Sequence, residues 1–208
     1  MGWTPLFLDM KDKKVLVVGS GEVGSRRADK FLEAGAQVII LGNQISSELL
    51  SNGAYLKPPQ EAEKWVSWAD LVVVASGDSV LNQLVSELGK NKLLNRADQP
   101  DGGNVIVPSS FFIEDVQICI FTQKKSPLMA RELRKKIENV ITEEDILQLE
   151  LQNYARNQLK SKLKDQKERK TYLYQLLDDE EIKNLLNKGK IQKAKLYVDN
   201  VINSDLKV

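Results

Sequence analysis

The chain has 208 residues, 42% of them hydrophobic and 28% charged, and its 30 basic and 29 acidic side chains leave a net charge of +1. This balance is ordinary for a globular domain and no apolar run approaches the roughly 20 residues that span a bilayer, so we expect no nucleic-acid partner and no membrane segment. The single cysteine fits a reducing cytoplasm, and the N-terminus has no basic segment followed by an apolar one, so we expect no signal peptide. The absence of histidine removes the commonest metal ligand and the commonest general base.

The first hundred residues alternate predicted strands and helices, which favours a doubly wound parallel sheet. Helices are expected at about 23–34, ending at Gly35, and within 79–90, ending at Gly89. Five short, largely apolar runs are typical of strands. They lie at 15–18, 36–41, within 68–76, at 92–95 and at 104–108.

The second half of the chain has a different pattern. Residues 116–121 are typical of a strand that would bury Cys119, and Ser126 with Pro127 marks a helix start, as N-cap and first helical residue. From residue 142 the sequence is charged, leucine-spaced and nearly free of glycine, which predicts helices only. We therefore expect an α/β fold: a Rossmann-type parallel sheet, then a small α+β segment, then a helical C-terminal domain.

Three glycines follow the first predicted strand and open the first helix. Gly19, Gly21 and Gly24 have the G-x-G-x-x-G spacing of a dinucleotide-binding loop. The first permits a tight turn, the second lets a pyrophosphate approach the backbone, and the third lets helix and strand pack closely. The helix N-terminus at Glu22 and Val23 would supply N–H donors to the anion. The alternative, a glycine-rich turn without a ligand, is disfavoured because three glycines at this spacing offer little packing benefit.

The end of the second predicted strand bears on the choice between NAD and NADP. NAD sites usually carry a carboxylate there, which holds the ribose hydroxyls. This chain has Asn43 and Gln44 instead, with Asn43 nineteen residues after Gly24. An amide can hydrogen-bond to a ribose but does not repel a 2′-phosphate as a carboxylate would. The loop alone therefore leaves NAD and NADP open.

Several motifs together resemble one family. They are "GSGEVGSRR" at 19–27, "EAGA" at 33–36, "VVVASGD" at 72–78, "LLNRADQP" at 93–100, "GNVIVPS" at 103–109 and "SPLMARELRKKIE" at 126–138. Their order and spacing are similar to those of the siroheme-synthase family of precorrin-2 dehydrogenases and sirohydrochlorin ferrochelatases. The resemblance implies NAD-dependent oxidation of precorrin-2 to sirohydrochlorin, with iron insertion in some members. It also implies a homodimer that forms through the segment 109–138. In the sequence this segment lies between an NAD-binding Rossmann domain at 1–108 and a helical C-terminal domain at 139–208.

The same resemblance assigns roles around "NRADQP". Asp98 falls on the acidic position of the family and would accept the proton that the oxidation releases. Asn95, Arg96 and Ala97 would line the nicotinamide side of the cleft. From the residues alone, a plain turn initiated by Asp98 is the favoured alternative, and the nearby Asp101 is a second acidic candidate.

Further candidates lie on both sides of this motif. Ser76 follows the third strand, where α/β sheets bind ligands, although it could equally belong to a helix cap. Ser126 matches a serine of the family, with capping as the favoured role. Lys124 and Arg131 could attract the carboxylates of a tetrapyrrole, or they could form an ordinary solvated face. The chain departs from the family at 122–125, where relatives carry glycine and small residues. We assign no metal site.

Three functions stay open on these grounds. The first is an NAD-dependent precorrin-2 dehydrogenase, and the second is a bifunctional enzyme that also inserts Fe²⁺ into sirohydrochlorin. The third is a regulatory module that binds a dinucleotide without turnover. Such modules usually carry an acidic residue after the second strand, so Asn43 and the Ser126-Pro127 motif count against this third function.

Overall fold

The computed structural model describes residues 2–206 and separates into two compact units, divided between Val107 and Pro108. The first unit is built on a five-stranded, fully parallel sheet with the order β3-β2-β1-β4-β5. Its elements are β1 (Lys14–Val18), α1 (Glu22–Glu33), β2 (Gln37–Leu41), α2 (Ser47–Ser51), β3 (Tyr55–Lys57), α3 (Ala62–Trp68), β4 (Leu71–Val74), α4 (Ser79–Leu88) and β5 (Leu93–Arg96), with single 3₁₀ turns at Pro59–Glu61 and Pro100–Gly102.

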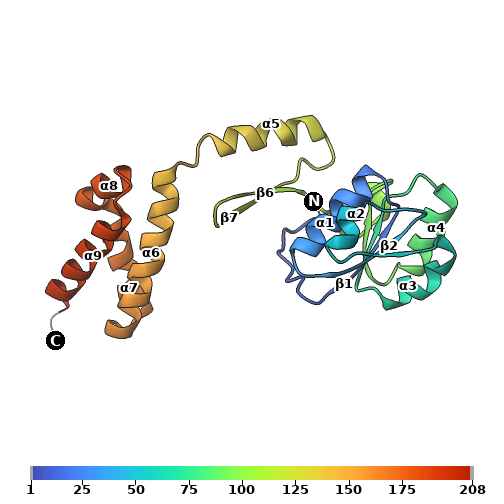
Figure 1. The fold of residues 1–208 in the computed structure, drawn as a ribbon. Helices are drawn as coiled ribbons and strands as arrows, with labels where there is room; N and C mark the ends of the chain where they lie inside the picture. Colours follow the sequence, from blue (N-terminus) through green and yellow to red (C-terminus); the bar gives the residue numbers. More distant parts are fainter. Residues whose placement is uncertain (1, 207–208) are drawn as a thin grey trace. The chain divides into compact units, whose positions relative to one another are not determined.

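Both faces of this sheet are buried, which explains why its strands are continuously apolar rather than alternating. Val15 and Val17 of β1 pack with α1 and α2 on one face. Leu16 and Val18 pack with α3 and α4 on the other face (Figure 1). The predicted doubly wound parallel sheet is confirmed, with strand bounds that differ from the expected ones by one to three residues.

One predicted strand is wrong. Residues 104–108 belong to no sheet ladder, although the run is apolar and β-branched. The backbone N–H groups of Asn104 and Val105 both donate to the same carbonyl of Leu94, so the segment turns away from β5 instead of extending the ladder. Sequence analysis also missed α2, β3 and α3, which lie between the second and third predicted strands.

The second unit begins with an antiparallel hairpin, β6 (Ser109–Ile113) and β7 (Val116–Ile120), followed by α5 (Pro127–Glu138). The predicted helix start is confirmed, because Ser126 Oγ accepts a hydrogen bond from Met129 N at 3.1 Å and Pro127 is the first helical residue. The expectation that Cys119 is buried is wrong: its side chain is exposed. Successive strand residues face opposite sides, and Cys119 shares the outward side with Gln117.

Four helices complete the chain: α6 (Glu143–Lys162), α7 (Gln166–Asp178), α8 (Glu180–Asn187) and α9 (Ile191–Asp205). Leu151, Leu159, Ile182, Leu186 and Ile202 form the centre of their common core. The all-helical prediction for this region is confirmed. Within the described part of the chain, no helix is both long and apolar enough to cross a membrane.

Three tyrosine hydroxyls fasten the rim of this helical core by donating to carboxylates on other helices. Two of these bonds join α9 to the long helices α6 and α7, and the third joins α9 to the start of α8. The pairs are Tyr154 with Asp199 at 2.7 Å, Tyr172 with Asp205 at 2.9 Å, and Tyr197 with Asp179 at 3.2 Å.

Candidate dinucleotide-binding and catalytic site

The glycine loop leaves β1 at the carboxyl edge of the sheet, beside β4. The connections from β1 lead outward to β2 and β3, whereas β4 and β5 lie on the other side, so the β1–β4 junction is the crevice where such sheets bind ligands. Gly19 has φ +103°, and a Cβ at this position would lie 2.7 Å from the Ala75 carbonyl and the Ser76 nitrogen. The two loops therefore touch, and only glycine fits at position 19.

Gly24 and Gly21 serve different purposes in the same loop. A Cβ at Gly24 would lie 2.0 Å from the Gly19 carbonyl, so this glycine is required for the close packing of α1 on the loop. A Cβ at Gly21 would meet nothing within 4 Å. Gly21 is the N-cap of α1 and no side chain caps the helix there. The first N–H groups of α1 thus have no capping side chain, and no side chain at Gly21 blocks an approaching pyrophosphate.

Glu22 and Val23 begin α1 and both are exposed. The Glu22 carboxylate, 91% exposed, lies 3.7 Å from Arg26 one turn along the helix. The backbone N–H groups of Glu22 and Val23 therefore remain available to an anion. These observations fit the pyrophosphate of a dinucleotide, with binding by the backbone rather than by charged side chains.

Gly42, Asn43 and Gln44 follow β2, where the ribose of a dinucleotide would lie. A Cβ at Gly42 would approach Ser20 Oγ to 2.8 Å, so the end of β2 packs directly on the glycine loop. Asn43 and Gln44 are exposed amides that can donate to and accept from ribose hydroxyls.

Asp98 lies just beyond β5, and its carboxylate accepts several side-chain hydrogen bonds. Arg96 Nε donates to Asp98 Oδ1 and Arg96 Nη2 to Oδ2, both at 2.7 Å. Arg96 Nη1 donates to Ser86 Oγ at 2.8 Å, and Asn82 Nδ2 donates to Asp98 Oδ2 at 3.1 Å. The Arg96 side chain is 7% exposed and that of Asp98 is 22% exposed, so the pair is partly shielded from water.

The charge state of Asp98 follows from these contacts. Desolvation is the largest single influence and acts to raise the pKa of Asp98, but the hydrogen bonds and charge of Arg96, with backbone hydrogen bonds at Gln99 and at Asp98 itself, lower this pKa below its usual value. The same pairing acts on Arg96 in the opposite direction, because its hydrogen bond to Asp98 raises the pKa of Arg96. Asp98 is therefore held as a carboxylate at neutral pH.

Asn82 links Asp98 to the loop that touches the glycines. Ser76 Oγ donates to Asn82 Oδ1 at 2.6 Å, and Asn82 Nδ2 also donates to the Ser76 carbonyl at 2.9 Å. Asp78 caps α4, since its Oδ1 accepts from the N–H groups of Val80 and Leu81. A continuous set of contacts thus runs from Gly19 through Ser76 and Asn82 to Asp98.

Asn95 and Ala97 are bonded within the protein. Asn95 is 2% exposed, donates through Nδ2 to the Val105 carbonyl at 2.8 Å, and accepts from Arg27 Nη1. The Ala97 N–H donates to the Val74 carbonyl at 2.8 Å. Burial, followed by the charge of Arg26, lowers the pKa of Arg27. Asn95 consequently joins β5 to Arg27 of α1 and to the backbone at Val105.

Lys124, Ser126 and Arg131 belong to the second unit. Lys124 lies in a turn with φ +65°, Ser126 caps α5, and Arg131 is an exposed residue of that helix.

Sequence analysis missed three residues of the site: Arg27, Asn82 and Ser86. Asn82 and Ser86 are nearly buried on α4, beside the fully buried Val85. Polar residues four positions apart lie on one face of a helix, and these two are next to an apolar position. This pattern could have indicated a buried polar network. Arg27 gave no such signal, because its partner Asn95 lies 68 residues away in sequence.

The comparisons with known proteins agree with this geometry. A family described as putative NAD(P)-binding matches residues 6–109. The putative precorrin-2 dehydrogenase of Methanocaldococcus jannaschii is 30% identical over 198 residues, which cover 88% of this chain and 94% of that protein. The precorrin-2 dehydrogenase of Methanosarcina barkeri is 30% identical over 192 residues, covering 86% of this chain and 85% of the relative.

Longer relatives match over part of their length. A siroheme synthase of Neisseria meningitidis serogroup C is 32% identical over 178 residues, which are 83% of this chain and 37% of the relative. The chain thus spans less than half of that protein. Among solved structures, SirC, a precorrin-2 dehydrogenase, superposes with a TM-score of 0.77 and covers 95% of this chain and 100% of its own. At 22% identity this match shows a common fold.

Proposed function

The chain belongs to the precorrin-2 dehydrogenase family, and on that premise we propose that it oxidises precorrin-2 to sirohydrochlorin with NAD⁺ as the electron acceptor. The observation that carries this proposal is the joined set of contacts from the glycine loop to a carboxylate held ionised at Asp98. The oxidation transfers a hydride from the macrocycle to the nicotinamide and releases one proton, so it needs a dinucleotide site and a proton acceptor close to each other.

The glycine loop would hold the pyrophosphate through backbone N–H groups at the start of α1. Asn43 and Gln44 would contact the ribose, and Ser76 would line the crevice at the end of β4. The nicotinamide supplies the hydride acceptor. These roles place the chemistry at the β1–β4 junction, near the loop that carries Asp98.

Asp98 acts in two ways in this proposal. Loss of a hydride leaves the macrocycle cationic, and a fixed carboxylate stabilises that developing charge. The cation is also a stronger acid than its precursor, so a carboxylate with a lowered pKa is basic enough to accept the released proton and pass it to solvent. Arg96 keeps Asp98 ionised, and Asn82 orients it towards the Ser76 loop.

We propose in addition that the enzyme is a cytoplasmic homodimer. The hairpin and α5 expose large apolar side chains, among them Phe112 and Leu128, each 65% exposed. In this segment only Phe111 and Ala130 are buried, too few for a core of its own. A symmetric partner would cover these side chains. Ser126, Lys124 and Arg131 of the same segment would contact the carboxylates of the tetrapyrrole.

An anaerobic assay tests the proposed reaction. Precorrin-2 and NAD⁺ are mixed with the chain, and NADH absorbance is followed together with the macrocycle spectrum. Equal amounts of NADH and sirohydrochlorin are expected. A chain that binds NAD⁺ by calorimetry yet forms no NADH would instead be a dinucleotide sensor. Addition of Fe²⁺ or Co²⁺ after the first step, with the spectrum read again, shows whether metal insertion follows.

A further inference from the structure

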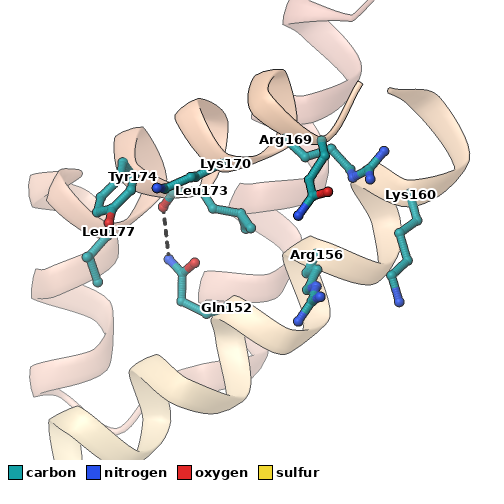
Figure 2. Close-up of a pocket in the computed structure, with 9 residues that line it drawn as sticks. Gln152, Arg156, Lys160, Arg169, Lys170, Leu173, Tyr174 and Leu177 are labelled. Carbon is teal, nitrogen blue, oxygen red and sulfur yellow. Dashed lines mark hydrogen bonds between the residues drawn. The ribbon is translucent and has the colours of Figure 1, made fainter. Parts of the chain in front are cut away.

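A groove of about 510 Å³ lies between α6 and α7 in the helical part of the second unit (Figure 2). The groove belongs to the second unit, whereas the glycine loop and Asp98 belong to the first. Two side chains fix its walls. Gln152 Nε2 donates to the Leu173 carbonyl at 3.2 Å, which fastens α6 to α7. Arg169 Nη1 donates to the carbonyls of Leu163 and Lys164, at 2.6 and 2.8 Å, and thereby orders the turn between the two helices.

The charge of this groove differs from that of the whole chain. Residues 151–170 carry seven basic and two acidic side chains, although the net charge of the chain is only +1. Four of the basic side chains line the groove, and no acidic side chain is among its lining residues in the part that the structure describes. The basic lining residues are Arg156, Lys160, Arg169 and Lys170.

Two of these cations are uncompensated within the described residues. Arg156 and Lys160 are exposed, lie one helical turn apart on α6, and make neither an ion pair nor a hydrogen bond within residues 2–206. By contrast, Lys195 of α9 forms an ion pair with Glu150 of α6 at 2.6 Å. Two adjacent unpaired cations facing a groove form an attractive site for carboxylates.

The opposite end of the groove is apolar. Leu173, Tyr174 and Leu177 of α7 line it, and Lys170 Nζ lies 5.8 Å from the centre of the Tyr174 ring. Figure 2 shows Tyr174 and Leu177 at one end and Arg156 with Lys160 at the other. A ligand that matches both ends carries carboxylates on a flat apolar body. A hydrophilic acidic peptide would leave the apolar end without a partner.

We propose that the α6–α7 groove is a second binding site for a polycarboxylate with a flat apolar body, and that its occupant is the tetrapyrrole. The identity of this occupant rests on the proposed function, whereas the ligand chemistry rests on the groove itself. The site holds the macrocycle outside the dehydrogenase crevice, by ion pairs to its carboxylates and by stacking on Tyr174.

Uroporphyrin III, a stable and fluorescent octacarboxylate porphyrin, is a suitable probe for the full-length chain. Its binding is measured by fluorescence titration at low salt, and its position by hydrogen exchange of the α6 and α7 peptides. The groove variant is Arg156→Gln/Lys160→Gln. The matched control is Lys188→Gln/Lys193→Gln, which removes the same charge from exposed lysines that do not line the groove.

In the unmodified chain and in the control, uroporphyrin III is expected to slow hydrogen exchange in 152–177. In the groove variant this protection disappears, and binding weakens by about three- to thirtyfold, as expected for the loss of two exposed or half-exposed ion pairs. Equal binding by the groove variant and the control overturns the proposal. Binding without protection of α6 and α7 overturns it too.

A third arm uses poly-glutamate of equal charge as a competitor. If poly-glutamate displaces uroporphyrin III at an equal concentration of negative charge, the groove is a general anion-binding surface. This outcome overturns the proposed selectivity for a flat macrocycle. None of these measurements requires turnover. If uroporphyrin III protects α6 and α7 but the chain forms no NADH, the proposed groove stands and the proposed dehydrogenase function is rejected. If the chain forms NADH but this protection is absent, the dehydrogenase function stands and the groove is rejected.

Discussion

Arg96 Nε and Nη2 donate to the two carboxylate oxygens of Asp98, each across 2.7 Å, so residues two positions apart form a bidentate pair. The third guanidinium nitrogen of Arg96 reaches Ser86, and Asp98 also accepts from Asn82. Asp98 therefore does more than begin a turn, because its carboxylate is the partner of a nearly buried cation. This relationship sharpens the tests of its role in catalysis.

Asp98→Asn removes the negative charge and places an amide N–H₂ opposite an Arg96 donor. We expect dehydrogenation to slow by about 10²–10⁴-fold at saturating NAD⁺, the usual effect of losing a general base. The affinity for NAD⁺, measured by calorimetry, should stay near the unmodified value, because the glycine loop is untouched. Asp101→Asn, a neighbouring acidic position, is the control and should turn over normally. Near-normal turnover of Asp98→Asn would leave Asp98 a purely structural role.

This substitution should also lower the free energy of unfolding by about 1–3 kcal/mol, because Arg96 loses its charged partner. Rates must therefore be compared well below the melting temperature of the variant. If the activity loss follows only from unfolding, it will disappear when rates are normalised to the folded fraction.

Arg96→Gln tests the electrostatic part of the argument. Arg96 opposes the desolvation that raises the pKa of Asp98, so its removal should raise this pKa. In the proposed mechanism, activity requires the carboxylate and is lost as pH falls through the pKa of Asp98. The acidic limb of the kcat profile should thus move to higher pH in the variant. An unchanged limb would mean that the limb reports another group.

The local parts of the fold were predictable from the sequence, because they depend on neighbours in the chain. Apolar runs of four or five residues marked the strands of a sheet buried on both faces, and the spacing of Gly19, Gly21 and Gly24 marked the loop. The segment 104–108 was misread because its apolar residues look like a strand, whereas its backbone donors converge on one carbonyl of Leu94. Nothing in the local pattern reveals that convergence.

The hydrogen-bonded network around Asp98 was only partly predictable from the sequence. Asp98 could be named from a motif, yet its carboxylate is held in place by a hydrogen bond from Asn82, sixteen residues earlier, and its pKa is lowered by Arg96, whose partial shielding from water the motif does not show. The bond between Arg27 and Asn95 joins α1 to β5, and such long-range pairs arise from the packing of the sheet. Cys119 was misplaced because an apolar neighbourhood in sequence does not say which side of a hairpin faces inward.

Gly21→Asp separates folding from cofactor binding. A Cβ at this position meets no atom within 4 Å, and aspartate is a favourable N-cap for α1, so the variant should be as stable as the unmodified chain. Its carboxylate would occupy the approach of the pyrophosphate and repel it, and we expect no calorimetric binding of NAD⁺.

Gly24→Ala is the contrasting variant. Its Cβ would lie 2.0 Å from the Gly19 carbonyl, so it should lower the melting temperature as well as weaken binding. If the folded Gly21→Asp variant binds NAD⁺ as tightly as the unmodified chain does, the glycine loop is not the cofactor site.

The raised pKa of Tyr172 predicts that the protein loses stability at alkaline pH. Desolvation, followed by the hydrogen bond to Asp205 and its charge, raises the pKa of Tyr172 from 10.0 to about 12. Between these values the folded state keeps a proton that the unfolded state has lost, so the free energy of unfolding falls as pH rises from 10 towards 12. Tyr172→Phe should reduce this slope in urea unfolding at pH 9, 10 and 11, whereas an unchanged slope would exclude Tyr172 as its source.

The proposed dimer makes Phe112 and Cys119 informative. Phe112 is 65% exposed on β6, and Cys119, the single cysteine of the chain, is exposed on β7 of the same hairpin. If a second copy covers this segment, Cys119 should react slowly with a thiol reagent at micromolar protein concentration and faster on dilution. Light scattering should give twice the chain mass of 23.5 kDa at the higher concentration.

Phe112→Ser removes a large apolar side chain from the proposed interface without opening a cavity in the single chain. We expect its dimer to dissociate at least tenfold more readily, because burial of such a side chain contributes about 1.5–3 kcal/mol, and Cys119 to react at the rapid rate under all conditions. Tyr55→Ser is the matched control, since Tyr55 is also 65% exposed but lies on β3 of the first unit. If both variants dimerise like the unmodified chain, the hairpin is not the interface. If the unmodified chain is monomeric with a fast-reacting Cys119, the dimer itself is rejected.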